Sequence, residues 1–459
     1  MEGLGIMSVV NNKDTFSPIK EKIEKLVSTK DLDKVKNDPK IEINKEHQDI
    51  RSHIRLIGSW LAYSNEINNI NYALDYQGSI DVIDFFSGCG GVSTGFKAVT
   101  SVIPSFRERG AVDIDIKANL TYEANLGIQP KHFDINDLAM KSSSELNALF
   151  GIERKKPLVL IGCAPCQGFS SHSKKLRMDN DIRNTLVGTF AKVAAKLNPD
   201  FVIMENVPEL LAKKYWGNFQ EFKESMEEHG YNVRATIVNM AEYGVPQARF
   251  RALVVASKKK FLMPKGFLDR KNYRTVRDAI GYLPPIEPGI FCENDPFHVT
   301  ARHQKSTVDT IASVPKNGGS RPQGVGPQCL DKVKGFSDVY GRLYWDRPSI
   351  TITNYARNPA SGRFSHPEQN RGLSIREAAL LQGFPSNFIF EGTFDEKFRQ
   401  IGNAVPPRFS AYLATHILGE MIADEPTETD YTEDLKYDVT EPVSNSFSSV
   451  IAGLKNRKG

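Results

Sequence analysis

The clearest pattern in the chain is an alternation of short apolar runs with segments of helical periodicity, which begins at Ile80 and ends near Ala256. Short apolar runs are typical of buried strands, whereas apolar positions three or four apart are typical of helices. The expected strands are 80–86, 111–114, 158–161, 201–204, 232–239 and 251–256, and the expected helices are 92–99, one through Tyr122, and 185–197. This alternation predicts an α/β fold with a doubly wound, Rossmann-like and mostly parallel sheet.

The segments on either side of this alternation differ from it in composition and pattern. Residues 1–78 are polar and rich in Lys and Glu, with helical patterns that begin at Ser17 and that run through 50–61. We interpret them as a helical extension that packs on or solubilises the rest, rather than as a DNA-binding element. The expected divisions are this extension at 1–78, an α/β domain at 79–257 that residues 398–420 complete, a smaller irregular domain with a hinge at 258–397, and an acidic to polar tail at 421–459 that is expected to be disordered.

The composition is that of an ordinary globular protein. The chain has 459 residues, enough for two or three domains, and is 40% hydrophobic and 25% charged. A net charge of +4 is only weak support for a polyanionic partner. We expect no transmembrane helix and no signal peptide, because the chain has no long uncharged apolar stretch. Five cysteines, an odd number, do not suggest a disulfide framework, so a reducing cytosol is expected.

A cysteine, Cys166, lies in a turn between Pro165 and Gly168, soon after the apolar run 158–161. The carboxyl ends of strands are where ligands and chemistry collect in open α/β sheets, so this thiol is a candidate nucleophile. Cys163 and Cys166 also form a C-x-x-C pair, which leaves a redox dithiol or half of a zinc site as alternatives. No second C-x-x-C or H-x3-H accompanies the pair, and no metal site is predicted.

A glycine-rich turn connects the first expected strand to the helix that follows it, over 84–91. Such a turn allows a ligand to approach the backbone closely. Its spacing, Gly88-x-Gly90-x4-Gly95, differs from the dinucleotide pattern, so NAD is disfavoured. Asp113 and Asp134 end later strands, and together with the turn they outline an adenosine site, although each acid alone is equally typical of a solvated surface.

Three further polar groups follow or precede expected strands or helices. Glu205 would lie beside Cys166 if their strands are neighbours, as a general acid or as a plain helix cap. Arg249 and Arg251 alternate on an extended chain and point the same way, toward acceptors or toward solvent. Residues 402–407 open a late helix, whose N-terminus suits a carboxylate or is a simple capping turn.

Taken together, these stretches closely resemble the cytosine-C5 DNA methyltransferase family of the prokaryotic restriction-modification type. The motifs occur in the family's order over residues 80 to 420: Phe86-Ser87-Gly88-Cys89-Gly90-Gly91, Pro165-Cys166-Gln167, Glu205-Asn206-Val207, Gln247-x-Arg249-x-Arg251, Arg376-Glu377-Ala378-Ala379-Leu380-Leu381-Gln382-Gly383-Phe384-Pro385 and Gly402-Asn403-Ala404-Val405. Six ordered motifs at sensible separations are highly specific. Two departures are Cys163-Ala164 where the family more often has Gly-Pro or Gly-Phe, and Ile114 where it often has an aromatic residue.

The resemblance implies a catalytic mechanism and a cofactor. The implied catalytic residues are Cys166, Glu205, Arg251 and Arg249, with Arg249 supporting the loop. The implied cofactor is S-adenosylmethionine, held by Phe86, Ser87, Gly88, Cys89, Gly90, Gly91, Asp113, Ile114, Asp134, Pro165, Leu186, Asn403 and Ala404. The Cys166 thiolate would add to C6 of a flipped cytosine, and nearby cations would activate it. The candidates for those cations are His172, Lys174 and Lys175.

By the same resemblance, the irregular domain is a target-recognition domain for duplex DNA. The residues expected to contact DNA are Gln167, Ser170, Arg321, Thr351 and Thr353, together with Lys258 to Lys260, Arg302, Lys305, Arg342 and Arg347 at phosphates and 317–321 at base edges. A cognate restriction endonuclease and a cytoplasmic, nucleoid-associated location are also implied.

Three alternatives stay open on the sequence. The tRNA-methylating branch of the family has similar catalytic motifs, but its Cys-Phe-Thr signature is missing here and the long basic region favours duplex DNA. A DNA-binding regulator would not need the intact set of Cys166, Glu205 and Arg251. A dithiol oxidoreductase would need Cys163 and Cys166 to alternate between free thiols and a disulfide. The surrounding motifs disfavour this alternative.

Overall fold

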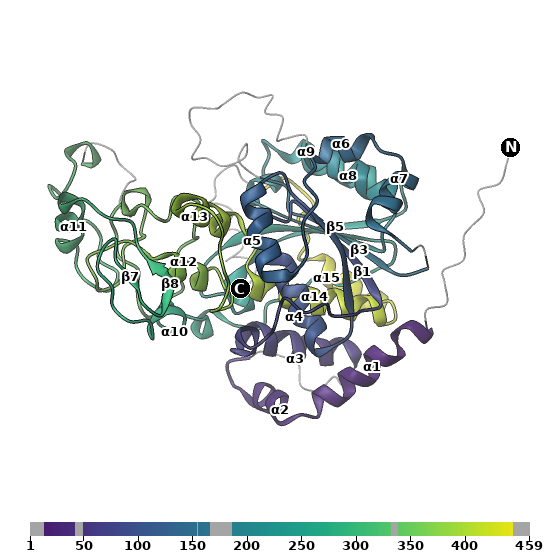
Figure 1. Cartoon of the computed structure of the whole chain (residues 1–459). Helices are drawn as coiled ribbons and strands as arrows, with labels where there is room; N and C mark the ends of the chain where they lie inside the picture. The colour runs from purple at the N-terminus through teal and green to yellow at the C-terminus, as the bar shows by residue number, and fades with distance from the viewer. Residues whose placement is uncertain (1–12, 42–48, 154, 166–185, 332–337, 444–459) are drawn as a thin grey trace.

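A six-stranded sheet organises the large domain of the computed structural model, which describes residues 13–41, 49–153, 155–165, 186–331 and 338–443 (Figure 1). The strands are β1 (Ile80–Phe85), β2 (Phe106–Val112), β3 (Leu158–Gly162), β4 (Phe201–Asn206), β5 (Asn232–Asn239) and β6 (Phe250–Ser257). Their order is β2-β1-β3-β4-β6-β5, and only β6 runs antiparallel to its neighbours. The predicted α/β fold with a mostly parallel sheet is therefore confirmed.

Both faces of the sheet are covered, as the unbroken apolar character of its strands requires. Alternate residues of β3 enter different cores: Val159 and Ile161 face one, and Leu160 faces the other. The first core contains residues of α3 (Ile50–Tyr63), α4 (Gly91–Val102), α5 (Ile116–Leu126) and α14 (Pro407–Ile422). The second contains residues of α6 (Ile135–Met140), α7 (Ser143–Phe150), α8 (Leu186–Leu197) and α9 (Trp216–Glu227).

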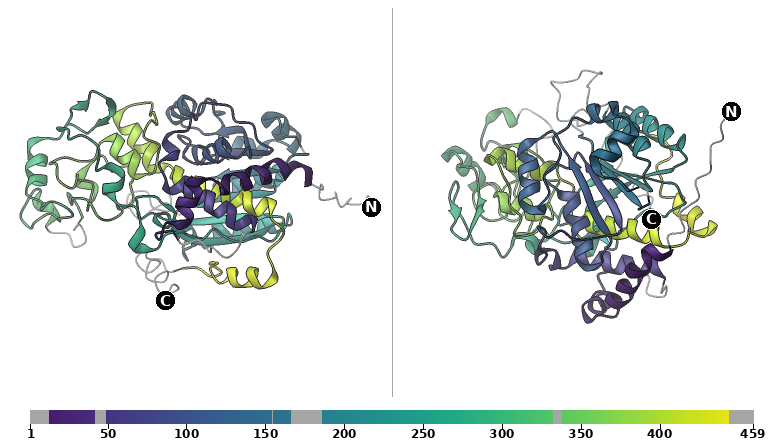
Figure 2. Two further views of the ribbon diagram at one scale, coloured as in Figure 1. Left: turned by 90° about the horizontal axis from the view of Figure 1, so that it is seen from below. Right: turned by 45° about the vertical axis from the view of Figure 1, so that its right-hand side comes forward.

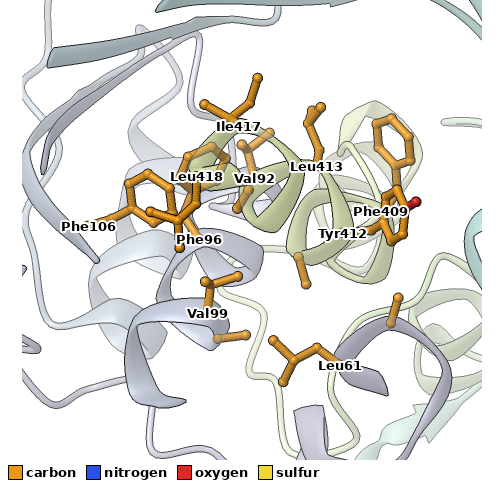
Figure 3. Close-up of a cluster of buried hydrophobic side chains, with 14 of the residues drawn as sticks. Leu61, Val92, Phe96, Val99, Phe106, Phe409, Tyr412, Leu413, Ile417 and Leu418 are labelled. Atoms are coloured by element: carbon orange, nitrogen blue, oxygen red, sulfur yellow. The ribbon is translucent and has the colours of Figure 1, made fainter. Parts of the chain in front are cut away.

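Helix α14 lies between α3 and α4 and is buried along nearly its whole length (Figure 3). Glycines allow both neighbours to come close. A Cβ atom built on Gly95 of α4 would lie 2.4 Å from the nitrogen of Ala411, and one built on Gly58 of α3 would lie 2.1 Å from Oγ1 of Thr415. The large side chains around these crossings, among them Phe96 and Leu413, complete the core. The last stretch of the family resemblance is thus packed against the first.

The smaller domain lies to one side of the sheet and consists mainly of loops (Figure 2). Its elements are α10 (Val276–Ile280), β7 (Phe291–Cys292), β8 (Asp295–Val299), α11 (Lys305–Ala312), α12 (Ile375–Leu381) and α13 (Phe394–Asn403). Arg342 is 1% exposed and donates to the carbonyl oxygens of Val314 and Ile311. The prediction that Arg342 contacts DNA phosphate is therefore wrong, because its guanidinium group is used to hold loops of this domain together.

The chain outside the two domains is more ordered than its polarity predicts. The segment 421–443 was expected to be disordered, yet it forms α15 (Glu428–Leu435) and continues along the edge strand β5. Its carboxylates are partners for a buried cation: Arg234 pairs with Asp434 at 2.8 Å and with Asp438 at 2.7 Å. An acidic segment can dock when a charge of opposite sign is already buried opposite it.

The N-terminal extension is helical, as predicted, but its helices do not begin where the sequence pattern placed them. Its helices are α1 (Lys13–Val27), which starts upstream of Ser17 and contains Pro18, then α2 (Lys30–Asn37), which the pattern did not predict, and α3. Residues of all three contribute to the core under the sheet, including Ile23, Leu32 and Ile57. The short 3-10 helices are η1 (Glu66–Asn68), η3 (Pro208–Leu211), η4 (Met240–Tyr243), η5 (Arg270–Asn272), η6 (Gln328–Leu330) and η7 (Pro359–Ser361). In the parts of the chain just described, no helix is both long and apolar enough to span a membrane.

Candidate active site

The loops that follow β1, β2, β3 and β4 meet at one edge of the sheet because these four strands are parallel. The last residue of β1, Phe85, is in register with Val112 of β2 and Gly162 of β3. Two hydrogen bonds extend this pairing into the loops: the Cys163 amide donates to the Phe85 carbonyl at 3.3 Å, and the Ser87 amide donates to the Val112 carbonyl at 3.1 Å. Most of the residues predicted to bind a cofactor start from this edge.

The glycine-rich turn has the backbone shape that its sequence predicts. Phe86, Gly88 and Gly90 have φ angles of 56°, 52° and 90°, a region that glycine enters without strain and other residues rarely adopt. The Asp113 carboxylate fixes the turn, because its Oδ2 accepts from the Gly88 amide at 2.8 Å and its Oδ1 accepts from the Asp115 amide at 2.8 Å. Burial raises the pKa of Asp113.

Two observations show that this turn is shaped for a polar ligand. The Ser87 hydroxyl oxygen is buried and has no hydrogen-bond partner among the described residues, a state that is costly unless a ligand or water satisfies it. A Cβ atom built on Gly88 would meet no atom within 4 Å, so open space lies beside the backbone there. Ile114, 64% exposed, stands next to Asp113 and offers a free apolar surface. These features fit a nucleoside-containing cofactor.

The turn 404–406, between α13 and α14, contacts the glycine-rich turn directly. A Cβ atom built on Gly91 would lie 2.3 Å from the Val405 carbonyl oxygen and 3.3 Å from Cβ of Ala404. The Ala404 carbonyl in turn accepts from Gln382 at 2.6 Å and from Arg249 at 3.3 Å. Asn403 itself is exposed. The first and last predicted motifs thus form one surface.

The remaining residues predicted to bind the cofactor make contacts that are typical of helix ends, loops or packed cores. Asp134 is the N-cap of α6 and accepts from the Asn136 amide at 2.8 Å, in an exposed position. Leu186 begins α8, and Pro165 is half-buried at the end of the described part of its loop. Cys89 is buried in the core of the small domain, where its Sγ lies 3.7 Å from the Gln400 carbonyl oxygen. Burial raises the pKa of the Cys89 thiol, so this cysteine is a packing residue.

Glu205 and Arg251 form an ion pair beside the loop that leads to Cys166. They lie on the antiparallel strands β4 and β6, with Oε1 of Glu205 3.0 Å from Nε of Arg251. Their side chains are 9% and 13% exposed, so both are largely withdrawn from water. The next residue, Asn206, donates from its side chain to the Ala164 carbonyl at 3.4 Å and thereby ties β4 to that loop. The sequence-based prediction gave Asn206 no role, although an amide directly after Glu205 in a buried strand end is a usable signal.

Arg249 links the loops that surround the site. It is buried and donates to the carbonyl oxygens of Ile352, Gly402 and Ala404 at 3.3–3.4 Å. The Gln247 side chain makes a similar link, since its Oε1 accepts from the Ile352 amide and its Nε2 donates to Gln382. These contacts join the large domain to the small domain at the site.

Several residues with predicted roles lie outside the described residues, namely the catalytic Cys166, the DNA-contacting Gln167 and Ser170, and the candidate activating cations His172, Lys174 and Lys175. Of the others, Thr351 is half-buried and donates to the Ala248 carbonyl, and Thr353 is exposed. Arg321 is bound within its own loop, where it donates to the Val325 carbonyl at 2.6 Å and pairs with Asp331 at 2.8 Å. Exposed positions are also held by Arg302, Lys305 and Arg347.

The three lysines 258–260 lie at the opposite edge of the sheet from Glu205. They follow Ser257, which is in register with Phe201 at the start of β4. Lys259 donates to the Ala423 carbonyl at 3.0 Å, and Lys260 pairs with Glu428 at 2.6 Å. The prediction that these lysines contact DNA phosphate is wrong, because the antiparallel direction of β6 takes them away from the site.

The fold and this edge of the sheet are those of a Rossmann-like α/β protein. A prophage-encoded E. coli protein described as a candidate DNA modification methyltransferase has the same fold, with a TM-score of 0.58 at 24% identity, over 75% of this chain and 100% of that one. The model of the family described as C-5 cytosine-specific DNA methylase matches residues 80–419. The chain belongs to this family, and the resemblance predicted from its motifs is confirmed.

Two relatives are similar over most of the chain. Type II methylase M.HgiDII of Herpetosiphon aurantiacus is 36% identical over 349 residues, which are 73% of this chain and 94% of the relative. Type II methyltransferase M1.HphI of Haemophilus parahaemolyticus is 34% identical over 348 residues, which are 75% and 88% of the two chains. Family membership makes this chain a DNA (cytosine-5-)-methyltransferase, as the sequence predicted.

Proposed function

We propose that this chain transfers a methyl group from S-adenosylmethionine to C5 of a cytosine flipped out of a specific duplex DNA sequence, through a covalent bond between Cys166 and C6. The observation that carries the proposal is the Glu205–Arg251 pair, 3.0 Å apart and largely buried, at the same sheet edge as the glycine-rich turn. An anionic group and a cationic group fixed side by side suit a ring that presents a donor and an acceptor on adjacent atoms.

Cytosine C5 is a poor nucleophile, and the proposed mechanism overcomes this by covalent catalysis. The Cys166 thiolate adds to C6, and the electron pair of the C5–C6 bond becomes available at C5. Glu205 binds N3 and the exocyclic amine, and Arg251 binds O2, so that charge developing on the ring is stabilised as the thiolate adds. After C5 has gained its methyl group, a base removes the C5 proton and the thiolate leaves C6, which restores the aromatic ring.

The cofactor in this proposal is S-adenosylmethionine, which supplies an electrophilic methyl group when it is bound. Asp113 would hold the ribose hydroxyls and Ile114 would cover one face of the adenine. Ser87 and the turn 86–91 would contact the polar part of the cofactor, and Asn403 and Ala404 would hold its methionine end. The unpartnered Ser87 hydroxyl and the open space at Gly88 support this assignment.

The base must leave the helical stack to reach the thiol, which costs a few kcal/mol. We propose that the irregular domain 258–397 recognises the target sequence and that Thr351 and Thr353 contact the DNA backbone. We also propose that a restriction endonuclease of the same specificity is the functional partner, because two of the relatives carry type II names. A cytoplasmic, nucleoid-associated location follows from the substrate.

The test is transfer of labelled methyl from S-adenosylmethionine to duplex DNA and, in parallel, to tRNA, with Cys166→Ser as control. Label at C5 of cytosine in DNA that disappears in the variant would support the proposal, and sequencing would then map the target. Label only in tRNA would move the chain to the RNA branch. Absence of label from both, with cofactor bound, would favour a DNA-binding regulator.

A further inference from the structure

Residues 62–73, which we call the strap, lie outside residues 80–419 that the family model matches, yet they contact α14, the small domain and the end of α5. The carbonyl oxygens of Ala62 and Ser64 both accept from Nη1 of Arg408, at 2.8 and 2.7 Å. Oδ1 of Asn68 accepts from the amide of Ser386 in the small domain at 3.0 Å. A Cβ atom built on Gly127, at the end of α5, would lie 2.9 Å from the Ala73 carbonyl oxygen.

Arg408 is the anchor of the strap on the large domain, and its surroundings are unusual. It is 5% exposed and stands in the first turn of α14, where the helix dipole disfavours a cation. Among the residues that the structure describes, no Asp or Glu forms an ion pair with it. Burial, and next the neighbouring Arg274, hold the pKa of Arg408 well below its usual range.

The groups that compensate this buried cation belong to α3. Ala62 and Ser64 stand at the C-terminal end of that helix, where carbonyl oxygens lack helical partners and the dipole favours a cation. Arg274 donates to the carbonyl of Tyr63, between them. Two arginines from distant parts of the sequence therefore converge on the end of one helix of the extension.

A short path leads from Arg408 to the cofactor turn. Val405, three residues earlier, contacts Gly91, as described above. On the other side, a Cβ atom built on Gly383 would lie 3.5 Å from Cγ of Arg408, and the adjacent Gln382 donates to the Ala404 carbonyl at 2.6 Å. Arg408 is thus linked on both sides to the turn 404–406, which lies against the glycine-rich turn.

We propose that the strap is a positioning element of the cofactor site and that Arg408 is its positioning residue. By binding the end of α3, Arg408 fixes the start of α14, and this fixes Asn403 and Ala404 where the methionine end of the cofactor would bind. The inference rests on the proposed function, since it concerns the S-adenosylmethionine site. It assigns a role in that site to a segment that precedes the family's domain.

The experiment compares Arg408→Met with Arg51→Met in the full chain. Met keeps an unbranched apolar stem in place of that of Arg and removes the donors, and loss of a buried charge need not destabilise a fold. Arg51 forms a similar bond at the other end of the same two helices, since its Nε lies 2.8 Å from Glu420 of α14. At 1.5 Å per residue, Glu420 is about 18 Å along the helix from Arg408. Arg408→Lys, which retains the charge, is the conservative variant.

The readouts are the Kd of S-adenosylmethionine by calorimetry, KM and kcat for methyl transfer, and Tm. Arg408→Met is expected to raise the Kd and the cofactor KM at least about fivefold with kcat within about twofold, and Arg408→Lys is expected to recover part of the affinity. Arg51→Met is expected to lower Tm without changing the Kd. An unchanged Kd in Arg408→Met, or equal losses in both variants, would overturn the positioning role. Wild-type protein that binds no S-adenosylmethionine would overturn the proposed function, and with it this inference.

Discussion

Glu205 and Arg251 form an ion pair across the antiparallel strands β4 and β6, with Oε1 of Glu205 3.0 Å from Nε of Arg251. Each group limits the directions in which its partner can point. Because both side chains are largely buried, a ligand that meets them exchanges little water and meets charges that are already oriented. This arrangement is the physical basis of the first prediction.

Glu205→Gln is expected to lower kcat/KM for methyl transfer by at least about 100-fold, because the amide cannot donate a proton to N3 as negative charge develops on the ring. The loss should be mainly in kcat, with cofactor affinity unchanged, since Glu205 is assigned to the base. Steady-state kinetics on duplex DNA measure it. Glu153→Gln is the control, because Glu153 also pairs with an arginine but is 55% exposed. Activity of Glu205→Gln near that of the control would contradict the assignment.

Ser87→Ala is expected to weaken S-adenosylmethionine binding about 3- to 10-fold, the effect of one hydrogen bond. The free protein should be as stable as the wild type or slightly more stable, because the Ser87 hydroxyl is buried without a partner. Ser93→Ala provides the contrast, since Ser93 donates to Asp84 at 2.8 Å and accepts from Tyr122 at 2.7 Å. That variant should lose stability. Calorimetry and thermal unfolding separate the two effects, and a Ser87→Ala protein with lowered Tm and unchanged affinity would refute the prediction.

The strand-helix alternation and the motifs predicted most of the fold and the sheet edge at which the described site residues lie. The strand boundaries at 232–239 agree to the residue, with an Asn at each end of the alternating pattern. The glycine-rich turn, Asp113 and the Glu205 strand end lie where parallel strands must bring them. Local pattern was sufficient here because these features depend on short-range periodicity and on the rule that strand ends meet at one edge.

The incorrect predictions have a common cause. Whether a charged side chain is buried or exposed depends on the groups that it meets in the folded chain. Arg342 is basic and lies in a loop, but its guanidinium group is buried because it donates to surrounding carbonyl oxygens. Residues 421–443 of the acidic tail are ordered because two of their carboxylates pair with the buried Arg234 of the edge strand β5. Lys258 to Lys260 follow a strand whose direction cannot be determined from its own residues. None of these partners is local, so no periodicity reveals them.

The stability of the small domain should fall in mild acid because of His366. Burial lowers the pKa of His366 to about 4, while Nδ1 of the neutral ring accepts from the amides of Glu368 and Gln369. A folded-state pKa below the unfolded value means that stability is present above about pH 6.5 and is lost as the pH falls toward 4. The expected loss from pH 7 to pH 5 is about 2 kcal/mol.

His366→Asn keeps an acceptor and does not titrate, so its stability should change less over this pH range. Denaturant unfolding at pH 7 and pH 5 gives both values. Below pH 5 a second group contributes in both proteins. Burial raises the pKa of Glu377, but the charge of Arg371, 2.8 Å away, outweighs this and lowers it to about 2. Stability from this pair is present above the unfolded pKa and is lost as the pH falls toward 2. Parallel losses in the two proteins between pH 7 and pH 5 would show that His366 does not titrate as described.

The last prediction concerns the docked tail. Asp434 is 1% exposed and serves three groups, since it pairs with Arg234 at 2.8 Å and Lys265 at 3.0 Å and accepts from the Met263 amide at 2.7 Å. Asp434→Ala leaves Arg234 with one carboxylate in place of two and is expected to cost about 3 kcal/mol of unfolding free energy. The matched variant is Glu433→Ala, whose exposed pair with Lys436 should contribute about 0.5 kcal/mol or less.

Because Asp434 pairs with Arg234 on the outer strand β5, which β6 separates from β4 and Glu205, methyl transfer well below Tm should be unchanged in Asp434→Ala. Denaturant unfolding and kinetics at low temperature test the two halves of this statement separately. A loss of kcat at a temperature where the variant is fully folded would mean that the tail acts on the site as well as on stability. An unfolding free energy equal to that of Glu433→Ala would mean instead that the buried pair contributes no more than an exposed one.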